Sequence, residues 1–81
     1  MTKERAKATI QKAVKNELPN ESQAVRDFIV KDILDMFLLL EQTEGDRYTS
    51  KENLDFSIDA TLYDGYLSDL IAEAKQETGE R

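Results

Sequence analysis

Side chains that support several common chemistries are missing from this chain. Its 81 residues include no cysteine, no histidine and no tryptophan. Without cysteine the chain has no disulfides and no thiolate nucleophiles, and without histidine as well it has no zinc site of the usual kind. Histidine is also the side chain best suited to proton transfer near neutral pH. We therefore expect no enzymatic activity and no bound cofactor.

Long hydrophobic runs are also missing. The longest uncharged apolar run is Met36 to Leu40, far shorter than the ~20 residues that a membrane-spanning helix needs. The N-terminus is charged from its third residue, which is unlike a signal peptide. We expect a soluble protein of the cytoplasm that does not bind membranes, and the lack of cysteine agrees with a reducing compartment.

The net charge of −6 is unevenly distributed. Residues 1–17 carry five basic and two acidic side chains, whereas residues 18–81 carry six basic and fifteen acidic ones. Such an acidic surface repels phosphates, so we expect no direct binding of nucleic acid. Carboxylates on a surface usually aid solubility, but they can also imitate the phosphates of a nucleic acid. The candidate residues for such an acidic face are Glu44, Asp46, Glu52, Asp55, Asp64 and Asp69.

The spacing of apolar residues predicts a single helical domain over residues 1–81. A first helix is expected over residues 3–17, and Pro19 prevents it from continuing. A second and longer helix is expected over residues 21–42, with Asn20 as its N-cap. Its apolar stripe recurs at helical spacing and consists of Val25, Phe28, Ile29, Ile33, Met36, Phe37 and Leu40.

The second half of the chain allows more than one interpretation. We expect residues 43–58 to form an ordered connection with at most one helical turn, although Leu54, Phe56 and Ile58 alternate as in a strand. A third helix is expected over residues 59–77, because its apolar stripe outweighs the turn signal at Asp64-Gly65. Residues 78–81 should form a frayed tail. The predicted fold is all-α: a small three-helix bundle, or three helices plus a short one, with a long central helix.

Residues 33–40 give the central helix apolar side chains on nearly all sides. Leu34 and Leu38 lie opposite the stripe that contains Phe37, and such a helix is normally buried all round. If two thin helices cannot cover it, a homodimer formed across Leu34, Phe37 and Leu38 would. The alternative is that the first helix or the connection covers them within one chain. Arg47 and Tyr48, in the polar connection, are further interface candidates.

Pairs of carboxylates are the only catalytic material in the sequence. Asp32 with Asp35, Glu41 with Glu44, and Glu52 with Asp55 are three residues apart, a spacing that lets two carboxylates on one helix share a magnesium ion. These pairs resemble those of the all-helical nucleotide pyrophosphatases. However, a chain with 17 acidic residues among 81 is expected to contain about as many such pairs by chance as this sequence has. In addition, no basic cluster accompanies the pairs to hold a triphosphate.

These observations lead to two functional hypotheses. The first is a non-enzymatic, regulatory module that binds another protein and self-associates through the second helix. The second is a small acidic inhibitor, of the kind made by phages or used as immunity proteins, that blocks the basic groove of a nuclease or another nucleic-acid-binding enzyme.

Overall fold

The computed structural model describes residues 3–63 and 66–79, and this part of the chain is all-helical. It contains α1 (Lys3–Glu17), α2 (Gln23–Glu44), α3 (Leu54–Tyr63) and α4 (Tyr66–Thr78). At ~1.5 Å per residue, α2 accounts for most of the molecule's longest dimension of 37 Å. The small all-α bundle with a long central helix is confirmed, but it has four helices where three, or three and a short one, were expected.

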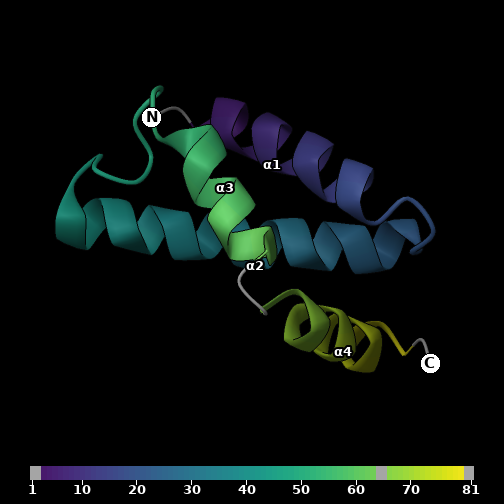
Figure 1. The fold of residues 1–81 in the computed structure, drawn as a ribbon. Coiled ribbons are helices and arrows are strands. Elements are labelled where there is room, and N and C mark those ends of the chain that lie inside the picture. The colour runs from purple at the N-terminus through teal and green to yellow at the C-terminus, as the bar shows by residue number, and fades with distance from the viewer. Residues whose placement is uncertain (1–2, 64–65, 80–81) are drawn as a thin grey trace.

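The helices surround α2 unequally. Figure 1 shows α1 running alongside α2, with α4 on another flank of α2. The third helix contacts α1 and α4. In the described part of the chain, no helix is both long enough and apolar enough to cross a membrane.

A single arginine organises the turn between α1 and α2. The Arg26 guanidinium donates to the carbonyl oxygens of Leu18, Pro19 and Glu21, at 3.1, 3.3 and 2.6 Å. These carbonyls belong to the turn, where the helical ladder does not supply donors. The predicted end of the first helix before Pro19 is confirmed, and Arg26 fixes the direction in which the chain turns back.

The N-cap of α2 lies two residues later than predicted. The Ser22 hydroxyl accepts a hydrogen bond from the backbone N–H of Val25 at 3.2 Å. Serine and asparagine are comparable N-caps, so the sequence alone did not separate Ser22 from Asn20. The helix therefore begins at Gln23, and it continues to Glu44, two residues beyond the predicted end.

The largest difference from the predicted elements lies after α2. The connection is limited to residues 45–53, and the single helix expected over residues 59–77 is replaced by α3 and α4. Leu54, Ile58 and Leu62 are each four residues apart, and all three are buried on one face of α3. Phe56 is 77% exposed and therefore does not share the buried face of Leu54 and Ile58. The alternating pattern of these three residues did not indicate a strand. The turn signal at Asp64-Gly65 lies outside the described residues.

Gly45 ends α2 in a backbone conformation that other residues avoid. Its φ of 69° and ψ of −150° fall in a region that is essentially restricted to glycine. We expect Gly45→Ala to lower the free energy of unfolding by about 1–3 kcal/mol, measured by urea denaturation followed by circular dichroism.

A matched control for Gly45→Ala is available at the end of α4. Gly79 also has a positive φ, of 75°, but it follows α4, in which Ala74 is the one completely buried side chain among those described, so the last turn of this helix can fray at little cost. Gly79→Ala should therefore shift the urea midpoint less than Gly45→Ala. If the two substitutions shifted it equally, or Gly45→Ala not at all, the conformation of Gly45 would not be important for the fold.

The core is built around two adjacent stripes of α2. One consists of Val25, Ile29, Ile33 and Phe37, and the other of Val30 and Leu34. The second stripe faces α1, because Val30 and Leu34 line a hollow together with Lys3, Lys7 and Gln11 of that helix. The remaining core side chains come from the other helices and include Ala6, Ile10, Val14, Leu54, Ile58, Leu62 and Ala74.

The expectation that one chain leaves Leu34 and Phe37 uncovered is wrong. Leu34 is 4% exposed and Phe37 is 1% exposed, and Leu38 is partly buried against the same core. The predicted elements included too few helices to cover α2. The second half of the chain supplies two helices where one was expected, and α1 adds its own apolar face. The alternative, burial within a single chain, is the one that the structure shows.

Candidate functional site

The predicted interface residues differ in how far they are exposed to solvent. Leu34 and Phe37 are buried in the core and offer no surface to a partner. Arg47 and Tyr48 lie in the exposed connection, where the Arg47 guanidinium carbon is 5.5 Å from the centre of the Tyr48 ring. This is a cation–π distance, so these two side chains are presented as a pair at the surface.

Large apolar side chains are exposed on α2 and α3 instead. Met36 is 40% exposed and Leu39 is 61% exposed, and their spacing of three residues places them on the same side of α2. Phe56, at 77% exposure, is the most exposed of this kind in the described part of the chain. Neither Leu39 nor Phe56 was predicted as an interface residue, because Leu39 lies outside the apolar stripe and Phe56 was interpreted as part of an alternating pattern.

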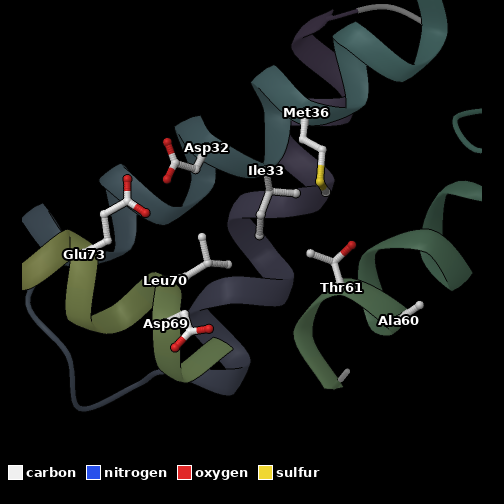
Figure 2. A pocket seen from close by; sticks show the side chains of 8 residues that line it. All are labelled: Asp32, Ile33, Met36, Ala60, Thr61, Asp69, Leu70 and Glu73. Carbon is white, nitrogen blue, oxygen red and sulfur yellow. The ribbon is translucent and has the colours of Figure 1, made fainter. Parts of the chain in front are cut away.

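An open groove adjoins these side chains. We call it the central groove; its volume is about 460 Å³ and its lining residues are Asp32, Ile33 and Met36 from α2, Ala60 and Thr61 from α3, and Asp69, Leu70 and Glu73 from α4. Figure 2 shows the side chains of Ile33 and Leu70 pointing into the space between the helices. Phe56 lies one turn before Ala60 in α3, and Leu39 lies three residues after Met36 in α2. By helical spacing we expect both side chains near the edge of this groove.

The charges around the central groove have one sign and lie to one side. Asp32, Asp69 and Glu73 surround its α4 side, whereas Met36 and Thr61 lie opposite them (Figure 2). Among the described residues that line the groove, none is basic. None of the three carboxylates forms an ion pair or a side-chain hydrogen bond with any part of the described chain. The groove therefore combines an apolar floor with negative charges that no described basic side chain pairs with.

The candidate acidic residues fall into separate regions. Glu44, Asp46, Glu52 and Asp55 are exposed at or near the connection, whereas Asp69 is in the central groove. Asp64 lies outside the described residues. Basic side chains are interspersed around the connection: Arg5 and Lys51 line the same hollow as Asp46 and Glu52.

Two polar contacts elsewhere hold the helices together. The Tyr63 hydroxyl, at the end of α3, donates to the carboxylate of Glu17 at the end of α1. This hydrogen bond and the negative charge of Glu17 raise the pKa of Tyr63. The Thr49 hydroxyl, 2% exposed, donates to a carboxylate oxygen of Glu41 at 2.8 Å and ties the connection to α2. Tyr63 itself is 67% exposed, so this hydrogen bond lies at the surface.

The carboxylates do not gather into a metal site in the described part of the chain. No group of three or more acidic side chains lies close enough there to hold a metal ion. The pairs at Asp32 and Asp35, Glu41 and Glu44, and Glu52 and Asp55 therefore do not converge as two magnesium-binding pairs on neighbouring helices would.

No known protein family matches this chain, and no curated protein or solved structure matches it either.

Proposed function

We propose that this chain is a non-enzymatic module that binds another protein through the surface shared by α2 and α3. The observation that carries the proposal is the exposure of Met36 in the lining of the central groove, together with exposed Leu39 and Phe56 on two of the helices that line it. Single exposed apolar residues are ordinary on a protein surface, but several that adjoin an apolar depression are typical of an interaction site. We place the interaction in the cytoplasm, in agreement with the lack of cysteine.

Self-association through α2 is a narrower form of this proposal. Because Leu34 and Phe37 are buried, two copies would meet through Met36 and Leu39, the exposed large apolar side chains of α2. A two-fold interface needs only one adhesive surface, so a single strip of α2 could be used twice. Sedimentation velocity at micromolar concentration would show a dimer; a monomer at every concentration would remove this form of the proposal.

An acidic inhibitor of a nucleic-acid-binding enzyme is the second candidate. It is supported by the net charge of −6 and by the carboxylates of the central groove, which lack basic neighbours. Binding of that kind depends on long-range charge and weakens steeply as salt is added. An apolar interface responds far less to salt, so salt dependence separates the two candidates.

Affinity capture with matched variants tests the proposed surface. Wild-type protein immobilised and exposed to an extract of its native host should retain a partner. A Leu39→Ser, Phe56→Ser double variant should retain it at least about tenfold less, because these side chains are expected in the centre of the contact. Both positions are exposed, so circular dichroism should show an unchanged helix content.

The control for that capture is a double variant on α1. Gln11 and Lys12 are also exposed, and Gln11→Ser with Lys12→Ser leaves the α2 and α3 surface intact. The proposal requires this control to retain the partner as wild type does, at low and at high salt. Equal retention by the Leu39, Phe56 variant and wild type would refute it, and loss of the partner only at high salt would favour the acidic inhibitor.

A further inference from the structure

We infer that the central groove binds a basic, amphipathic segment of the partner protein, with its apolar side chains against the floor and its lysine or arginine side chains against the acidic side. This inference rests on the proposed protein-binding function and adds to it the chemistry of the segment that is bound.

The floor of the groove favours apolar side chains. Ile33 is 1% exposed and forms part of the core, Leu70 is partly buried, and Met36 is 40% exposed beside them. An apolar side chain placed here removes Met36 and Leu70 from water, and burial of apolar surface is the main favourable term in association. Methionine also adapts its shape to different partners, which suits a surface that receives an incoming side chain.

The openness of the groove favours a macromolecule over a small molecule. Of its eight lining residues only Ile33 is buried, and the others are exposed or partly exposed. Sites for small molecules usually enclose most of the ligand surface, which this depression does not. A depression of this kind can instead receive a few side chains from one face of a helix or an extended segment, in the manner of a helix bound in a groove.

The acidic side selects for positive charge. Asp32, Asp69 and Glu73 have no basic neighbour among the described lining residues, so a lysine or arginine from the partner supplies a counter-charge. Phosphates and acidic segments are repelled by the same three groups. Two other hollows of similar volume differ in this respect: one contains Lys3, Lys7 and Lys31 with Asp27 and Asp35, and the other contains Arg5 and Lys51 with Asp46 and Glu52.

The most basic helix of a second copy, α1, does not supply the required segment. The chain's basic residues are concentrated in residues 1–17, but α1 exposes no large apolar side chain beside them. A segment that binds in the groove must carry apolar and basic side chains on the same face. We therefore expect it to come from a different protein.

Designed peptides test this inference without knowledge of the partner. The probe is a fluorescein-labelled helical peptide of about 16 residues with leucines on one face and lysines beside them, and its comparison peptide has glutamate in place of each lysine. Fluorescence anisotropy should show the lysine peptide binding at least about tenfold more tightly. A third peptide, with serine in place of leucine, should also bind at least about tenfold more weakly, because the floor is apolar.

Charge reversal at the groove provides the decisive comparison. Asp69→Lys with Glu73→Lys should weaken binding of the lysine peptide at least about tenfold. Glu52→Lys with Asp55→Lys changes the net charge by the same amount at exposed positions outside the groove, and should leave the affinity within about twofold. Helix content measured by circular dichroism confirms that each variant is folded.

Each other outcome overturns the inference. Equal weakening by both double variants would show a general attraction to an acidic protein, and equal binding of the leucine and serine peptides would show that the floor takes no part. If affinity capture depends on Phe56 but not on Asp69 and Glu73, the proposed function stands and the inference about the groove fails. If it depends on none of them, both fail.

Discussion

Ile29→Asp is expected to unfold this domain. Ile29 is completely buried, in the middle of the α2 stripe that packs against the other helices. An aspartate there places a carboxylate in the core with no described basic side chain among its neighbours in that stripe, and burial of an unpaired charge is among the most destabilising of single changes. We expect a loss of at least about 4–5 kcal/mol.

That loss is large compared with the total stability of such a short chain. At ~0.05–0.15 kcal/mol per residue, 81 residues give roughly 4–12 kcal/mol. The measurement is the urea midpoint followed by circular dichroism at neutral pH. Leu39→Asp is the matched control, because it lies in the same helix and makes the same change at a side chain that is 61% exposed. Similar midpoints for the two variants would contradict the assigned core.

Phe37→Ala is the second substitution expected to lower the free energy of unfolding strongly. Phe37 is the largest of the completely buried side chains, at 1% exposure, and its truncation removes buried apolar surface and leaves a cavity. Changes of this type cost about 3–5 kcal/mol. Urea denaturation should therefore show a much lower midpoint with an almost unchanged slope, because the surface exposed on unfolding changes little.

Phe56→Ala is a matched control for Phe37→Ala, because the same substitution is made at 77% exposure. Substitutions at such exposed positions usually change the free energy of unfolding by no more than about 0.5 kcal/mol. This pair also separates stability from binding: Phe37→Ala should affect the fold, and Phe56→Ala should affect partner capture alone. A loss of stability at Phe56 equal to that at Phe37 would mean that α3 is placed wrongly.

The helical class and the central helix could be predicted from the sequence because a period of 3.6 residues is a local property. Val25, Ile29, Ile33 and Phe37 recur at this spacing and all four are buried. The N-cap was less certain because Asn20 and Ser22 are both good caps, and the choice between them depends on how the turn packs. Arg26 contributes to that packing with three hydrogen bonds to turn carbonyls, which no local pattern indicates.

The division of the second half of the chain into α3 and α4 was harder to predict, and missing it led to a wrong prediction of the interface residues. Leu54, Ile58 and Leu62 form a helical face, but Phe56 between them made the segment resemble a strand. With one helix expected where α3 and α4 are found, only two thin helices were available to cover α2, so Leu34 and Phe37 were expected at an interface. The central groove needs three helices at once, and a sequence pattern cannot show which residues of different helices become neighbours.

The attachment of α4 determines when the groove exists. Among the described side chains of α4, only Ala74 is completely buried, while Leu67, Leu70 and Ile71 are partly buried. A helix that buries so little is expected to detach from the rest at a low free-energy cost, before the pair formed by α1 and α2 separates. Amide hydrogen exchange should therefore be fastest in α4, and a ligand that contacts Leu70 and Glu73 would slow it. The same weakly held helix that forms one wall of the groove therefore sets the fraction of time for which the groove is present to receive a partner.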